Sequence, residues 1–113
     1  MKQSTVKLEG GGIHGHGREA IAVEDRGSKI VVIGARIFEN AQQTGAQVRV
    51  GYRGTAEMED TRIQDSPHGG ILVGYEGTLI LKRCQVHNNK AYNLLKRRYA
   101  GRVEFIDMPP VED

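Results

Sequence analysis

Alternating apolar and polar residues recur along this chain with a period in the twenties. A glycine closes each unit, with spacings of 27, 23 and 24 residues: Gly27, Gly54, Gly77 and Gly101. An aliphatic marker inside each unit recurs with spacings of 24, 26 and 23: Ile13, Ile37, Ile63 and Val86. Two independent markers with nearly the same period indicate a structural repeat.

The order of apolar and small positions is the same in each unit. In the unit from Gly54 to Tyr75, Ala56 and Met58 alternate, the small Thr61 follows, and Ile63 is the marker. A further alternating pair comes later in each unit: Ile21 with Val23, Val48 with Val50, and Ile71 with Val73. Strict alternation is the period of a strand with one buried face. Each unit is therefore expected to form three short strands.

This repeat predicts an all-β fold, a right-handed parallel β-helix of four to five rungs, each of about 23 residues. A small antiparallel sandwich is the alternative, but it needs no positional repeat. The long second unit places its extra residues at 41–44, as a protruding loop. In the fourth unit Arg97 is expected to take the place of Val23, Val50 and Val73. A fifth rung begins with Val103 and Phe105 and ends at Pro109 and Pro110.

The repeat and the equivalent positions of Asn40 and Asn89 resemble the pectin lyase-like right-handed β-helix superfamily. The resemblance runs from Thr5 to Met108. It implies the fold, but that fold carries lyases, hydrolases, epimerases, phage adhesins and plain scaffolds. The resemblance therefore does not select a function.

Composition sets outer limits on the interpretation. The 113 residues are expected to form one domain, 1–113, which is either complete or part of a longer chain. No apolar run is as long as a membrane span, and the first twelve residues lack the apolar middle of a signal peptide, so a cytoplasmic location is expected. The single cysteine, Cys84, excludes an internal disulfide, and its small-residue position suggests burial.

The net charge of +2 conceals an uneven distribution. Residues 77–103 contain seven basic side chains and no acidic one: Lys82, Arg83, Lys90, Lys96, Arg97, Arg98 and Arg102. A basic rung suggests nucleic acid, but aromatic residues are only 5% of the chain and no nucleic-acid-binding motif is present. Nucleic acid is therefore not the expected partner.

Carboxylates provide the main candidate for chemistry. Glu39 and Asp65 fall two residues after successive markers, with Asn88 next, so they should lie on adjacent rungs about 5 Å apart. Such a pair could serve a glycosidase or hold a hard cation, with Lys82 or Arg83 contacting an acidic polysaccharide. Calcium-dependent lyases of the resembled superfamily carry a larger acidic cluster, which this chain does not match. Solvated corner residues are the favoured interpretation.

Histidines and tyrosines are weaker candidates. His14 and His16 have a spacing used in some metal sites, but two ligands do not make a site, and no cofactor is expected. Tyr52, Tyr75 and Tyr99 share a column. Inward rings would stabilise the stack, whereas outward rings could form a sugar-binding platform. The structural role is favoured.

Four aliphatic residues fall on the outward side of the first strands, where they predict a contact surface: Val31, Ile33, Ile80 and Ile106. No amphipathic helix precedes Val6 to cover the first rung. We therefore expect a non-catalytic binding or assembly module that contacts a second copy or a flanking domain. The alternative is a carbohydrate-active module.

Overall fold

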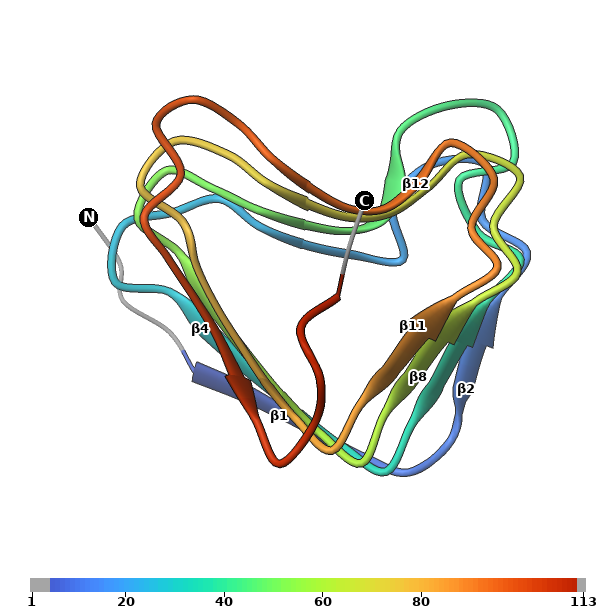
Figure 1. Cartoon of the computed structure of the whole chain (residues 1–113), viewed down its shortest axis with the longest axis horizontal. Coiled ribbons are helices and arrows are strands. Elements are labelled where there is room, and N and C mark those ends of the chain that lie inside the picture. Colours follow the sequence, from blue (N-terminus) through green and yellow to red (C-terminus); the bar gives the residue numbers. More distant parts are fainter. Residues whose placement is uncertain (1–4, 112–113) are drawn as a thin grey trace.

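Thirteen strands wind through three parallel sheets in the structure, a computed structural model that describes residues 5–111 (Figure 1). The first sheet contains β1 (Thr5–Glu9), β4 (Lys29–Ile33), β7 (Thr55–Glu59), β10 (Thr78–Lys82) and β13 (Arg102–Ile106). The second contains β2 (Gly12–His14), β5 (Arg36–Phe38), β8 (Arg62–Gln64) and β11 (Gln85–His87). The third contains β3 (Ile21–Val23), β6 (Ala46–Val50), β9 (Gly69–Val73) and β12 (Tyr92–Lys96). This arrangement confirms the predicted parallel β-helix.

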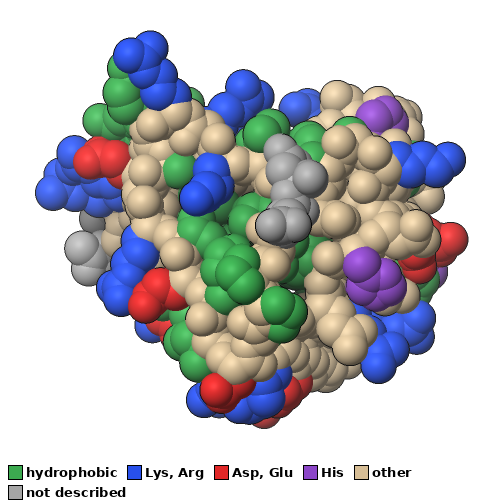
Figure 2. Space-filling view, in the orientation of Figure 1, with side chains coloured by type: hydrophobic (Ala, Val, Ile, Leu, Met, Phe, Trp, Pro, Cys, Tyr) green, Lys and Arg blue, Asp and Glu red, His purple; other side chains and the backbone are tan. Residues whose placement is uncertain are grey.

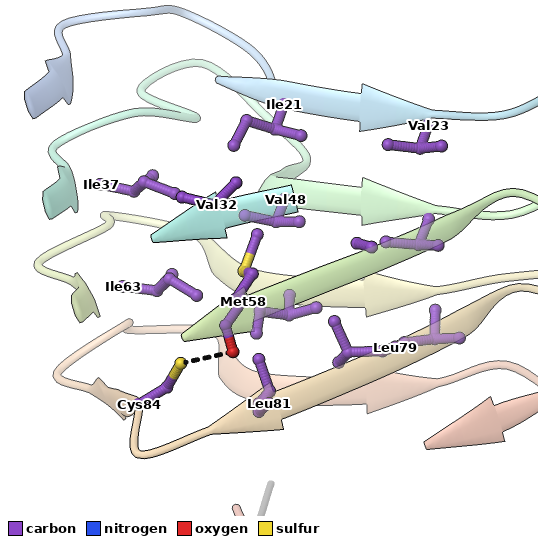
Figure 3. Close-up of a cluster of buried hydrophobic side chains, with 14 of the residues drawn as sticks. Ile21, Val23, Val32, Ile37, Val48, Met58, Ile63, Leu79, Leu81 and Cys84 are labelled. Atoms are coloured by element: carbon purple, nitrogen blue, oxygen red, sulfur yellow. Dashed lines mark hydrogen bonds between the residues drawn. The ribbon is translucent and has the colours of Figure 1, made fainter. Parts of the chain in front are cut away.

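The strand register confirms the predicted repeat. In the first sheet Val32 lies beside Met58, and Met58 beside Leu81. In the second sheet Ile37 lies beside Ile63, and Ile63 beside Val86. The inward side chains of the sheets pack together as one apolar core that runs through the stack (Figure 3). Each rung contributes inward aliphatic side chains from its strands in all three sheets, so these side chains are enough to fill the narrow core.

One predicted position in the fourth rung is wrong. Lys96, not Arg97, pairs with Val73, and the buried Leu94 continues the column of Ile71. The prediction counted back from the closing glycine, assuming a constant distance. Val73 precedes Gly77 by four residues, whereas Lys96 precedes Gly101 by five, so the corner after β12 holds one extra residue. Counting forward from the marker gives the same spacing of eight residues from Ile63 to Ile71 and from Val86 to Leu94.

Other details agree with the expected pattern. In the second rung, residues 42–44 are exposed and bulge from the stack (Figure 1), although Ala41 is completely buried. Val103 and Phe105 pair with Leu79 and Leu81 as the fifth rung. Beyond β13, Met108 and Val111 pack against the core. No helix among the described residues is long and apolar enough to cross a membrane.

Three corners join the sheets, and each uses left-handed backbone conformations at equivalent positions of successive rungs. The first corner joins the first and second sheets, and φ is 67° at Gly34, 52° at Asp60 and 50° at Arg83. Each of these amides donates to a carbonyl of the next rung, over 2.9, 3.0 and 3.0 Å. A left-handed non-glycine residue costs about 1–2 kcal/mol. Repeated inter-rung hydrogen bonds offset that cost at every rung.

A buried polar network crosses the rungs at the second corner, between the second and third sheets. Asn40 donates to the carbonyl of Ile13 (2.9 Å) and accepts from the amide of His16 (3.1 Å), which joins rungs one and two. Asn89 makes the equivalent bonds with Ile63 (3.3 Å) and Ser66 (3.1 Å), joining rungs three and four.

Gln47 connects the two asparagines. Its Oε1 accepts from Asn40 Nδ2 (2.9 Å), and its Nε2 donates to Asn89 Oδ1 (2.9 Å) two rungs away. Ala46 pairs with Gly69 and Val48 with Ile71, so Gly70 lies beside Gln47. The missing side chain of Gly70 leaves the space through which Gln47 reaches Asn89.

We predict that Gly70→Ala destabilises the fold by about 1–3 kcal/mol, the usual cost of overpacking. A Cβ at this position would lie 2.6 Å from the carbonyl oxygen of Asn93 and 2.7 Å from Nδ2 of Asn89. Urea unfolding measures the free-energy change. The matched control is Gly12→Ala, whose Cβ would lie no closer than 3.4 Å to a neighbouring atom. Equal stability of the two variants would contradict the assigned role of Gly70.

Candidate functional site

The second corner brings together the predicted carboxylates. Glu39, Asp65 and Asn88 occupy equivalent left-handed positions, with φ of 57°, 60° and 60°. They share an open hollow of about 500 Å³ with four other residues: Gln42, Ser66, Pro67 and Lys90. Aspartate and asparagine tolerate this backbone conformation better than most residues. The corner geometry therefore supplies a structural reason for Asp65 and Asn88, independent of any chemistry.

Hydrogen bonds distinguish the two carboxylates. Asp65 accepts from Asn88 Nδ2 through Oδ1 (2.7 Å) and from Gln64 Nε2 through Oδ2 (3.2 Å). Glu39 is exposed, and its carboxylate has no hydrogen bond or ion pair with any residue in the range 5–111. The Asp65 carboxylate is held in place by these hydrogen bonds, whereas the Glu39 carboxylate is free to turn toward a ligand. This asymmetry is compatible with binding, but it lacks the enclosure that catalysis normally requires.

Lys82 and Arg83 are separated from that hollow by β11, since they lie at the first corner. Lys82 contacts Glu59 (3.7 Å), and Arg83 contacts both Glu59 (2.7 Å) and Asp60 (2.9 Å). Arg83 also reaches Asp107 at 3.7 Å, so opposite charges alternate along the corner. Both cations are therefore already paired with carboxylates of neighbouring rungs. The predicted combination of Glu39 and Asp65 with Lys82 or Arg83 is therefore not assembled.

Histidines at the predicted metal position have other neighbours. His14 stacks on the ring of Phe38, with centroids 4.8 Å apart and an interplanar angle of 14°. His16 contributes its backbone amide to Asn40. Within residues 5–111, no three histidine, cysteine, aspartate or glutamate side chains converge to hold a metal ion.

The tyrosine column faces outward at the third corner, between the third and first sheets. Tyr52, Tyr75 and Tyr99 are 60%, 49% and 61% exposed, and successive ring centroids are 6.4 and 6.5 Å apart. Tyr52 and Tyr75 line a hollow of about 320 Å³ that also contains Arg49 and Arg97. The sequence left the direction of the rings open. The structure places them where a ligand can reach them.

Sequence reasoning overlooked the neighbourhood of these tyrosines. Arg49 comes from the outer face of β6, and Lys96 and Arg97 come from the end of the fourth rung. A second hollow, of about 530 Å³, is lined by four basic residues and no acidic one: Lys96, Arg97, Arg98 and Arg102, with Ala100, Gly101 and Val103. The basic composition of residues 77–103 was the available signal. The proximity of these basic residues to the tyrosines is seen only in the structure, where Arg97 also lines the hollow that contains Tyr52 and Tyr75.

The outer face of the first sheet is less exposed than its sequence suggested. Ile106 is 39% exposed, but Val31, Ile33 and Ile80 are half-buried. These four aliphatic residues border a hollow of about 260 Å³, together with Glu57, Met58, Glu59 and Lys82. Long charged side chains from neighbouring rungs cover part of each aliphatic side chain. The face is therefore mixed in character, with apolar strips between ion pairs.

Comparison with known proteins agrees with this architecture. A family model described as a right handed beta helix region matches residues 1–104. The chain belongs to this right-handed β-helix family. No curated protein and no solved structure matches the chain.

Membership in the right-handed β-helix family gives the fold of the chain but not its function, since proteins with this fold have many functions. The viewed end of the stack shows apolar atoms at its centre and charged side chains around its rim (Figure 2).

Cys84 of this β-helix is buried at the first corner, where its thiol donates to the carbonyl of Met58 (3.3 Å; Figure 3). Burial raises the pKa of the Cys84 thiol, so this cysteine is a poor nucleophile.

Charge pairing at the first corner leads to a pH-dependent prediction. The hydrogen bond from Arg83 lowers the pKa of the Asp60 carboxyl below its ordinary value. A lowered folded-state pKa stabilises the fold above the unfolded-state pKa, and this contribution is lost as pH falls through the folded-state pKa. We expect Arg83→Gln to raise the Asp60 pKa toward its ordinary value.

Carbon-13 NMR titration of the Asp60 carboxyl carbon tests this expectation. Arg62→Gln is the control, because Arg62 is exposed on the second sheet and has no ion pair with a described residue. An unchanged Asp60 pKa in Arg83→Gln would show that the pair has no effect in solution.

Proposed function

We propose that this β-helix is a non-catalytic assembly module that associates with a second copy through the outer face of its first sheet. The observation that carries the proposal is the hollow bordered by Val31, Ile33, Ile80 and Ile106. Burial of these side chains against a partner would remove apolar surface from water, which is the main driving force for protein association.

Charges on this face are already neutralised within the chain. Glu57 contacts Lys29 at 2.6 Å, and Glu59 contacts Arg83 at 2.7 Å. Glu104 contacts Arg102 at 2.6 Å. A locally paired charge costs less to cover with a partner than an isolated one. The apolar strips can therefore approach another copy without leaving an unpaired charge at the interface.

The size of the face limits the strength of association. Five strands about 4.8 Å apart and five residues long present roughly 20 by 16 Å. This area is less than half of the ≈ 800 Å² per partner that is typical of a stable interface. We therefore expect a weak dimer, populated at high protein concentration, rather than a permanent one.

Ile80→Glu is expected to abolish this association, because it buries a carboxylate beside Glu57 and Glu59 at the contact. Sedimentation equilibrium, with protein concentrations rising to about 1 mM, should show a monomer–dimer equilibrium in the unchanged chain. Leu95→Glu is the matched control, since Leu95 is half-buried on the outer face of the third sheet. A strict monomer over the whole range would refute the proposal.

The second candidate is carbohydrate binding at the second corner. The observation that favours it is the hollow of about 500 Å³ shared by Glu39, Asp65 and Asn88. Two carboxylates repel an acidic polysaccharide unless a cation bridges them or Lys90, in the same hollow, contacts the polymer. Calcium-dependent binding of a uronic-acid polymer would suit this arrangement.

The double variant Glu39→Gln, Asp65→Asn tests the second candidate. It preserves side-chain shape, and asparagine tolerates the left-handed backbone at position 65. Isothermal titration with polygalacturonate and calcium should show binding by the unchanged chain and none by the double variant, with equal thermal midpoints. Glu104→Gln, on the first sheet, is the control. Absence of binding by the unchanged chain would eliminate this candidate for that polymer.

A further inference from the structure

We propose that the third corner binds single-stranded nucleic acid, with bases stacking on its tyrosines and phosphates contacting its basic side chains. We call this region the Tyr–Arg surface and define it by its three rings and five cations: Tyr52, Tyr75, Tyr99, Arg49, Lys96, Arg97, Arg98 and Arg102. It is separate from the hollow at the second corner, and it meets the outer face of the first sheet at Arg102, the first residue of β13.

The tyrosines are the first line of support. Three of the six aromatic residues in the chain (4 Tyr and 2 Phe) are at least 49% exposed, and these three lie in one line, one per rung. Exposed aromatic rings that follow one another along a surface are typical of proteins that bind single strands, because every base offers a face for stacking. The repeat of the fold sets their spacing of 6.4 and 6.5 Å.

Ring orientation favours separate bases over one continuous flat ligand. Tyr52 and Tyr75 are inclined at 48°, and Tyr75 and Tyr99 at 67°. The three rings therefore do not form the level platform that a straight row of sugar rings would need. Bases of a single strand turn independently about their glycosidic bonds, so each can match the tilt of its own tyrosine.

The basic side chains are the second line of support. Lys96 and Arg97 make no ion pair with any carboxylate in residues 5–111, whereas Arg102 is paired with Glu104. Arg98 lies over the ring of Tyr99, 5.3 Å from its centroid. Unpaired cations in a hollow without acidic residues are suited to phosphate contacts.

Arg97 joins the rings and the cations into one surface. It lines the basic hollow of about 530 Å³ and also the hollow of about 320 Å³ that contains Tyr52 and Tyr75. Two carboxylates near the rings are paired, since Glu24 contacts Arg49 at 2.9 Å and Glu76 contacts Arg53 at 2.7 Å. Asp25 lies one rung from Tyr52 in the same column, is exposed and makes no ion pair with a described residue. A polyanion is therefore expected to approach from the side of Tyr75 and Tyr99, away from Asp25.

This inference reverses the expectation from sequence that nucleic acid is not a partner. That expectation rested on a low aromatic content and on basic charge confined to one rung. The fold gathers half of the aromatic residues at one corner, together with three cations of that rung that make no ion pair with a described residue: Lys96, Arg97 and Arg98. An acidic glycan or polypeptide would satisfy the charges but would not present an aromatic base to each ring.

Fluorescence anisotropy with a labelled twelve-residue deoxythymidine oligonucleotide tests the proposal. We expect binding at low salt, with log K falling by about 0.7 per unit of log salt for each phosphate contact. Tyr75→Leu should weaken binding roughly 5- to 150-fold, which corresponds to the loss of one stacked base. Arg97→Gln should reduce the salt slope by about 0.7.

The controls separate base stacking from simple charge attraction. Arg62→Gln, on the second sheet, should leave binding unchanged, and Tyr75→Phe should retain most of the affinity because the ring remains. An abasic strand of equal length should bind more weakly than the thymidine strand. Tyr99→Leu repeats the test at a second ring, and circular dichroism verifies the fold of each variant.

Several results would overturn the proposal. These are no binding at low salt, equal binding of the abasic and thymidine strands, or full affinity in both Tyr75→Leu and Tyr99→Leu. Equal competition by polyglutamate or polygalacturonate at matched charge would also overturn it, because the surface would then recognise charge alone.

Discussion

Parallel hydrogen bonding between equivalent strands of successive rungs is the constraint on which this structure depends. Once Val32 lies beside Met58, and Met58 beside Leu81, every other residue of those rungs is also placed in a column. Core, corners and surface then repeat together. A shift of one residue would turn the inward aliphatic side chains outward, so the narrow apolar core fixes the register strongly.

Polar groups inside the stack strengthen this register without widening the core. Gln47 spans from Asn40 to Asn89 because Gly70 leaves space between them. Both asparagines also bond to backbone groups of the preceding rung. A buried polar network of this kind is stabilising only when its groups are satisfied. Here the same contacts that satisfy the side chains also hold adjacent rungs together.

Repetition has a second consequence, which concerns the interpretation of surface residues. A column of like residues arises at a corner because the backbone there is the same in every rung, as with Asp65 and Asn88. Such a column can look like a binding site for purely structural reasons. The tyrosines at the third corner are different, because their exposed rings lie near Lys96 and Arg97, which make no ion pair in the described part of the chain. Their packing against one another does not account for those cations.

The sequence by itself determined the fold, the strand columns and most inward residues, because both the apolar alternation and the period are local properties. It also placed Glu39 with Asp65 and Asn88 at one corner. Three features could not be predicted from the repeat and were decided by the tertiary structure. These are the extra corner residue after Lys96, the outward direction of the tyrosine rings, and the ion pairs that Arg83 makes. Each of these depends on corner geometry and on contacts between rungs. The position of a residue in a repeat gives its column, whereas the path of the backbone around the corner decides which side chains meet.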